Sequence, residues 1–301
     1  MKALRDIGLV AVHEGLDALR SRRALVVLLL YMAAALCNMH WSINLLHRLE
    51  NELATALQLP ASERAGVIST ALWKSKPFQR MMRQMTQNDL VLQDITGKHP
   101  AELIYAFFAF FYTPLLVVLV AGNRIAEEIG SGSVRYTIVR ISRAGWSVGK
   151  FLGQTMMIGL ALLLSGLGAY AVARFRLAGS GAPGLLLNIV QWSARAWLYS
   201  FPFLGLAMGL SHLTRSASRA TVLGILAITL CFVLSILIRH FSGESGWRAM
   251  LPAIGMLLPD GYKMCLWRRS VPPLVSGGVT LVTLGFVYLL AGHACFRKRD
   301  V

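Results

Sequence analysis

Long apolar runs alternate with shorter polar segments along this chain. Stretches of about 20 residues with almost no charge begin near residues 24, 103, 146, 192, 220 and 274. A helix of about 20 apolar residues is long enough to cross the hydrocarbon core of a bilayer. The pattern predicts an all-α polytopic membrane protein with six transmembrane helices, over residues 24–43, 103–122, 146–173, 192–213, 220–238 and 274–296.

The segment before the first apolar run is amphipathic instead. In residues 1–23, apolar side chains recur at roughly helical spacing, and charged side chains occupy much of the rest. This pattern predicts an interface helix that lies along the membrane surface. The residues that we single out on this helix are Leu4, Ile7, Ala11, Glu14 and Leu19.

Two longer segments divide the predicted transmembrane domain, residues 24–301. Residues 44–102 begin with an amphipathic stretch that Pro60 interrupts, which predicts a small helical extracytoplasmic insert. Residues 239–273 are apolar but broken by Pro252 and Pro259. They are too interrupted to span and too apolar for a free loop, so we expect an outer re-entrant segment of short helices.

The distribution of charge predicts the orientation. Short loops rich in Lys and Arg are retained in the cytoplasm, and both ends of the chain and residues 124–150 and 214–219 are dense in these residues. We therefore expect a multi-pass protein of the inner (cytoplasmic) membrane with both termini cytoplasmic. Anionic lipid headgroups account for the net charge of +16 without a nucleic-acid partner.

Several sequence patterns of enzymes and carriers are absent. The chain has no GxxxxGK[ST], no GxSxG and no CxxC, and no Asp, Glu or Lys lies in the middle of a predicted span. It is thus not expected to be an enzyme, to bind a nucleotide, cofactor or metal itself, or to be an ion-coupled carrier. If it moves a substrate, the energy is expected to come from another chain.

The polar segment 124–150, between the second and third predicted spans, is the most distinctive. Glycines at 130 and 132 would turn the backbone, and residues 133–139 would form a short helix across the membrane surface. A partner that moved such a helix would tilt both flanking spans. Composition alone fits an ordinary basic inner loop equally well. The charged residues are Arg124, Arg135, Arg140, Arg143 and Lys150 against Glu127 and Glu128.

Residues 128–150 also resemble the signature of type-2 ABC transporter permeases. The matching positions are Glu128, then Gly132-Ser133-Val134-Arg135, then Ile141-Ser142-Arg143, then Gly149-Lys150. The chain departs from the family pattern at Arg140, where the family usually has Pro. The amphipathic N-terminus, the six spans and the broken segment before the last span resemble the family layout as well.

The resemblance implies a permease subunit that dimerises with a second copy or a homologue and binds two cytoplasmic ABC ATPase subunits. ATP and Mg would be bound by those ATPases. Residues 128–143 would form the coupling helix, and the N-terminal helix would pack against the same ATPase. The coupling residues implied are Glu127, Glu128, Gly132, Ser133, Arg135, Arg140, Ser142, Arg143 and Lys150.

Three functions are compatible with these features. We expect an ATP-driven exporter of a lipidic, amphiphilic or peptide substrate. One alternative is a mechanotransmission subunit that acts on an extracytoplasmic partner through residues 44–102, with nothing crossing the bilayer. The other is a membrane scaffold or assembly factor without an ATPase.

Overall fold

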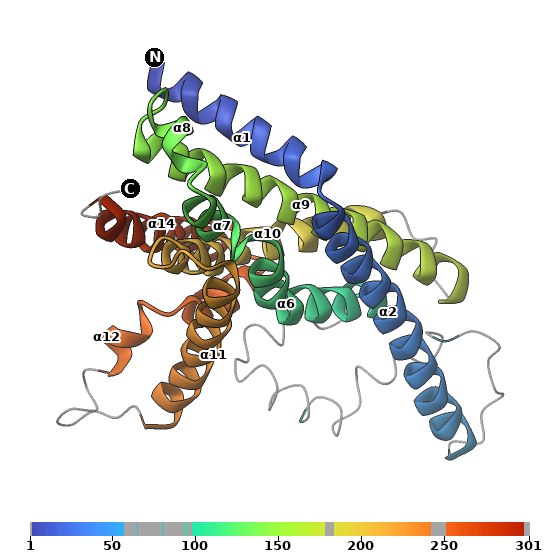
Figure 1. Ribbon diagram of the computed structural model, residues 1–301. Coiled ribbons are helices and arrows are strands. Elements are labelled where there is room, and N and C mark those ends of the chain that lie inside the picture. The colour runs from blue at the N-terminus through green and yellow to red at the C-terminus, as the bar shows by residue number, and fades with distance from the viewer. Residues whose placement is uncertain are drawn as a thin grey trace.

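The described residues of the computed structural model form an all-α bundle (Figure 1). They comprise residues 2–56, 98–177, 184–241 and 251–297, with Ala65, Arg80 and Asp94. An isolated bridge between Ala65 and Leu177 is the one β-type pairing within them. The predicted all-α class is therefore confirmed, whereas most of the predicted insert lies outside the described residues.

The helices follow the hydrophobic pattern closely, usually with a few more residues at each end. The long ones are α1 (Lys2–Arg20), α2 (Arg22–Ala56), α6 (Pro100–Ala121), α9 (Arg143–Arg176), α10 (Leu185–Ser211), α11 (Ala217–Phe241) and α14 (Val271–Arg297). The short ones are α7 (Arg124–Ser131), α8 (Val134–Ile138), α12 (Leu251–Gly255), the 3₁₀ helix η2 (Pro259–Tyr262) and α13 (Lys263–Trp267).

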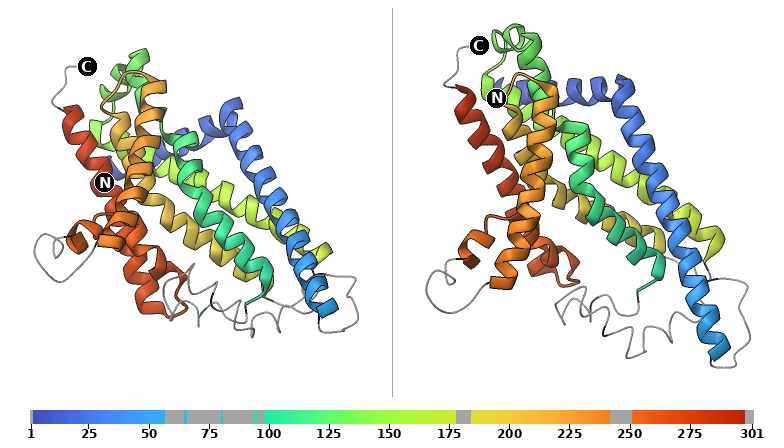
Figure 2. Two further views of the ribbon diagram at one scale, coloured as in Figure 1. Left: turned by 90° about the horizontal axis from the view of Figure 1, so that it is seen from below. Right: turned by 60° about the horizontal axis from the view of Figure 1, so that its bottom comes forward.

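Helix α2 is longer than the predicted first span. It continues without a break past residue 43 to Ala56, so the first part of the expected insert belongs to this helix. At about 1.5 Å per residue, its 35 residues extend about 52 Å, well beyond a hydrocarbon core of about 30 Å. Its far end projects from the bundle in two of the views (Figures 1 and 2).

Five of the helical segments described are long and apolar enough to cross a membrane: Arg22–Glu52, Pro100–Ser131, Arg143–Arg176, Ala217–Phe241 and Val271–Arg297. The sixth predicted span, α10, has 27 residues but is not among them. It nevertheless lies alongside α6 and α7, since Asn188 donates to Glu102 of α6 at one end and Ser211 accepts from the amide of Ala126 of α7 at the other. The count of six crossings stays a prediction.

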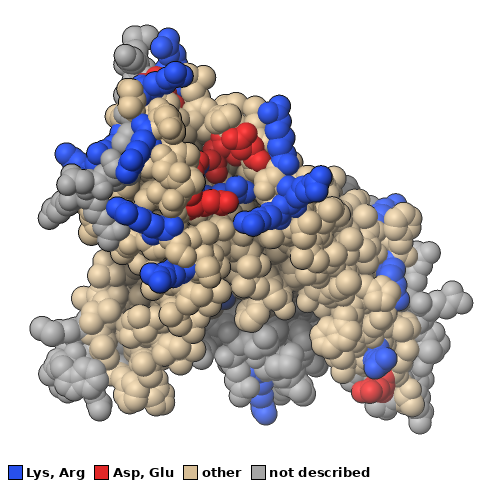
Figure 3. Space-filling model, in the orientation of Figure 1, with Lys and Arg blue, Asp and Glu red and all other residues tan. Residues whose placement is uncertain are grey.

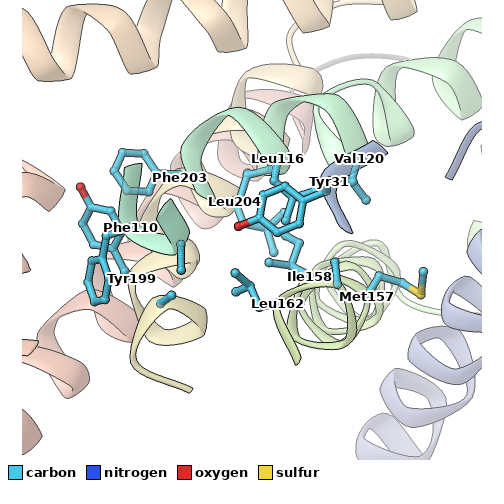
Figure 4. Close-up of a cluster of buried hydrophobic side chains, with 14 of the residues drawn as sticks. Tyr31, Phe110, Leu116, Val120, Met157, Ile158, Leu162, Tyr199, Phe203 and Leu204 are labelled. Carbon is cyan, nitrogen blue, oxygen red and sulfur yellow. The ribbon is translucent and has the colours of Figure 1, made fainter. Parts of the chain in front are cut away.

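Helix α10 is the centre of the bundle and packs against α6, α9, α11 and α14. Its Gly205 and Gly209 lie against the backbone of α14 at Gly285 and Gly292, so the missing side chains let the two helices approach closely. Large apolar side chains of α2, α6, α9 and α10 fill the space between these helices. Figure 4 shows Tyr31, Leu116, Ile158, Leu162 and Leu204 of this buried cluster.

Both chain ends lie at one end of the bundle, which we name the α8 end (Figure 2). It carries α7, α8 and the loop between α10 and α11, since Gly130 of α7 lies against the carbonyl of Arg215. Helix α1 packs along the first half of α9 at this end. In the space-filling view, basic side chains gather here around a smaller acidic group (Figure 3).

Candidate functional site

Gly132 separates the two short helices of the polar segment. It ends α7 in the left-handed conformation, with φ of 74°, which a residue with a side chain adopts only with strain. The buried side chain of Val134 then anchors α8. The glycine turn and the short helix predicted over residues 133–139 are both present, the helix as residues 134–138.

Helix α8 presents a mixed basic and apolar surface to solvent. Tyr136 is 83% exposed and Val139, just after the helix, is 84% exposed. Arg135 and Arg140 beside them are also exposed. Large apolar side chains that are exposed among charged ones are typical of a protein contact surface.

A buried lysine lies between two carboxylates from other helices. Lys150 of α9 is only 4% exposed, and its Nζ forms ion pairs with Glu14 of α1 and, at 2.6 Å, with Glu128 of α7. Trp146 donates from its indole nitrogen to the second oxygen of Glu128 at 3.0 Å. Gln154 donates to the second oxygen of Glu14. These five residues, Glu14, Glu128, Trp146, Lys150 and Gln154, form what we name the Lys150 cluster.

The Lys150 cluster connects three helices that are separate in the sequence. Removing one partner of a buried ion pair leaves an uncompensated charge and typically costs about 3–5 kcal/mol. The sequence singled out Glu14, Glu128 and Lys150 by different patterns, and the structure brings them together. The sequence analysis did not single out Trp146 and Gln154. Each lies four residues from Lys150, so all three side chains are on one face of the helix.

Glycines allow α1 to lie unusually close to α9. A Cβ built on Gly149 would be 2.6 Å from the Cβ of Val10, and one on Gly153 would be 2.8 Å from the carbonyl of Ala11. Ile7, Ala11 and Glu14 of the predicted interface helix thus face α9. Leu4 and Leu19 instead lie on its exposed side, with 75% and 40% of their surfaces accessible.

The other coupling residues singled out from sequence have local roles. Ser142 caps α9 by accepting from the amide of Gly145 at 3.1 Å, and the Ser133 hydroxyl donates to the carbonyl of Glu128. The Arg143 guanidinium lies 5.8 Å from the centroid of the Phe296 ring. Glu127 is 4.0 Å from Arg23, and both side chains are largely exposed, so this pair contributes little.

A second polar cluster at the α8 end was not predicted. The Ser147 hydroxyl lies 2.8 Å from Nε2 of His212 and 3.1 Å from Nδ1 of His293, and so connects α9, α10 and α14. His212, the C-cap residue of α10, is fully buried. Among the residues described, no group of three or more His, Cys, Asp or Glu side chains could hold a metal ion.

These features define a class of protein. The fold is a helical bundle with several membrane-spanning helices. Between two of them lie α7, which the Lys150 cluster joins to α1 and α9, and the short exposed helix α8. The chain is thus a polytopic helical membrane protein.

Comparison with protein families agrees with this class. A family model described as ABC-2 family transporter protein matches residues 9–253, most of the chain. The chain belongs to this family and is a membrane permease subunit of an ABC transporter, which implies an ABC ATPase as its partner. A search of curated proteins found no match.

Proposed function

We propose that this permease is the membrane subunit of an ABC exporter and that its ATPase docks on α8. The observation that supports this most directly is the exposure of Tyr136 and Val139 between Arg135 and Arg140, on and just after the short helix that follows Glu128 and the Gly132 turn. The ATPase would bind ATP and Mg and lie in the cytoplasm, so the α8 end and both termini would be cytoplasmic, consistent with their basic residues.

The Lys150 cluster would transmit the movement of the ATPase. A push on α8 reaches α7 through the Gly132 turn, and Glu128 of α7 is held by Lys150 and Trp146 of α9. Because Glu14 shares the same lysine, α1 would move with them. The displacement would tilt α6 and α9, which flank the segment, and two permease subunits would alternate between inward- and outward-open states.

The substrate is proposed from the character of the spans. No Asp, Glu or Lys lies in the middle of a predicted span, so a small ion would find few partners there. A lipidic, amphiphilic or peptide substrate is more compatible with such surfaces.

Copurification tests the docking site. The permease is purified in mild detergent from its own host, as wild type and as Tyr136→Ala with Val139→Ala. We expect an ATPase with a P-loop to accompany the wild type and to be reduced about tenfold or more in the variant, since truncating a hot-spot residue, among which tyrosine is enriched, costs about 2 kcal/mol or more.

The matched control is Leu186→Ala with Leu187→Ala at the start of α10, the opposite end of the bundle, where both side chains are also exposed. It should retain the ATPase. An undiminished ATPase signal in the α8 variant, with loss in the control, would refute docking on α8. Absence of any ATPase from the wild type would favour the scaffold alternative.

The length of α2 favours mechanotransmission as a second candidate. This one helix reaches from the α1 junction to Ala56, at the start of the region predicted to be extracytoplasmic, and could carry motion to a partner of residues 44–102. Deletion of residues 57–97 separates the candidates: a transmission subunit would lose its outer partner but keep ATPase binding. An exporter would keep moving its substrate.

A further inference from the structure

A pocket of about 230 Å³ lies where the junction of α1 and α2 approaches the end of α6 and the start of α7. Its walls include Arg22 and Arg23 of α2, Leu119 of α6, and Arg124 and Glu127 of α7. None of these side chains belongs to the Lys150 cluster. The pocket is therefore distinct from the Lys150 cluster, although Glu127 of α7 lines it.

The lining of the pocket has an excess of positive charge. Three guanidinium groups face one carboxylate, and that carboxylate is only 4.0 Å from Arg23 in an exposed pair. Within the described part of the chain, Arg22 and Arg124 form no ion pair. Guanidinium groups bind phosphate oxygens through paired hydrogen bonds, so the two arginines can accept an anion of this kind.

An exposed apolar stripe continues from the pocket along α6. Leu119 lines the pocket, and Leu115 and Phe111 follow at successive turns, 49%, 50% and 72% exposed, respectively. Residues four apart lie on one face of a helix, so the stripe leads from the arginines towards the middle of the bundle. A ligand with a phosphate joined to an acyl chain would cover both parts.

We propose that this pocket binds the phosphate of an anionic phospholipid from the leaflet at the α8 end, with an acyl chain along Phe111, Leu115 and Leu119. The lipid would connect the α1–α2 junction to the start of α7. A free phosphate group would use the arginines but leave the stripe uncovered. This proposal requires only that the chain lies in a membrane, and it does not require that an ATPase docks on α8.

Lipid binding to the purified full-length chain tests the proposal. Binding of phosphatidylglycerol and of phosphatidylcholine is measured by native mass spectrometry after delipidation in detergent. The pocket variant is Arg22→Gln with Arg124→Gln. The control is Arg215→Gln with Arg219→Gln, an exposed arginine of the α10–α11 loop and one in the first turn of α11, which also lie at the α8 end.

We expect the pocket variant to bind phosphatidylglycerol roughly thirtyfold more weakly, since each cation beside an anionic headgroup is worth about a factor of five. The control should remain within twofold of the wild type. Glu127→Gln should bind more tightly, because it removes the one carboxylate of the pocket, and a misfolded variant would not show such a gain.

Three results would overturn the proposal. The first is equal weakening in the pocket variant and the control, which would indicate general attraction to the basic surface. The second is equal binding of phosphatidylcholine and phosphatidylglycerol by the wild type. The third is displacement of phosphatidylglycerol by millimolar inorganic phosphate, which would make the pocket a site for free phosphate.

Discussion

Lys150 is a buried cation that two carboxylates from distant parts of the sequence compensate. Its ammonium contacts Glu14 of α1 and Glu128 of α7, while Trp146 and Gln154 bond the other carboxylate oxygens. Without the lysine, two acidic side chains would remain close together with little access to water. This one residue should therefore affect stability as well as coupling.

Lys150→Met should lower the free energy of unfolding by about 3 kcal/mol, the lower part of the range for breaking a buried ion pair. Reversible unfolding in mixed detergent micelles measures the change. Adding Glu14→Gln to this variant should restore part of the loss, because one of the two uncompensated charges is then removed. Arg135→Met, at an exposed site, should stay within about 0.5 kcal/mol of the wild type. Equal effects of Lys150→Met and Arg135→Met would contradict the structural role of the lysine.

The sequence analysis picked out three residues of the Lys150 cluster but did not predict that they lie together. Lys150 and Glu128 were singled out by a family resemblance and Glu14 by its place on an amphipathic helix. Nothing in the sequence indicates that α1 lies on α9, because that contact joins residues 136 positions apart. Amphipathic periodicity shows that a helix has two faces but does not identify what covers each.

Among the helices, the packing of α1 on α9 is the contact most dependent on small side chains. Gly149 and Gly153 leave room for the backbone of α1, and the predicted apolar positions divide between this buried contact and an exposed side. Leu4 and Leu19 belong to the exposed side, which suits the membrane interface predicted for this helix.

Gly149→Ala should destabilise the protein by about 1–3 kcal/mol, because the new methyl group overlaps Val10. Amide hydrogen exchange should become faster along α1. Gly15→Ala is the matched control, since a Cβ there meets nothing within 4 Å. In a helix, that control should be neutral or stabilise by up to about 1 kcal/mol. Slow exchange in α1 of the Gly149 variant would show that the close contact does not hold this helix.

Over the whole molecule, the number of membrane crossings depends on α10. This helix is central to the bundle, and its Arg195 donates to the carbonyl of Leu266 rather than facing lipid. The sequence predicted it as a span from its length and apolar content. Its polar residues were harder to interpret, since periodicity does not distinguish a protein-lined position from a lipid-facing one.

Six crossings require both termini on the same side of the membrane, as their common position at the α8 end suggests (Figure 2). Reporter fusions at the N-terminus and at the C-terminus should both indicate the cytoplasm. Reporters in opposite compartments would exclude six crossings and place α10 outside the set of spans.

Site-specific photo-crosslinking tests the central claim, that the ATPase docks on α8, most directly. A photoreactive residue replaces Tyr136 of α8 in one variant and Phe175 near the end of α9 in another, and the two side chains are 83% and 82% exposed. On irradiation in cells, the Tyr136 variant should crosslink to an ATPase with a P-loop, and the Phe175 variant should not. A crosslink from position 175 alone, or from neither position in cells that contain the assembled transporter, would contradict the account.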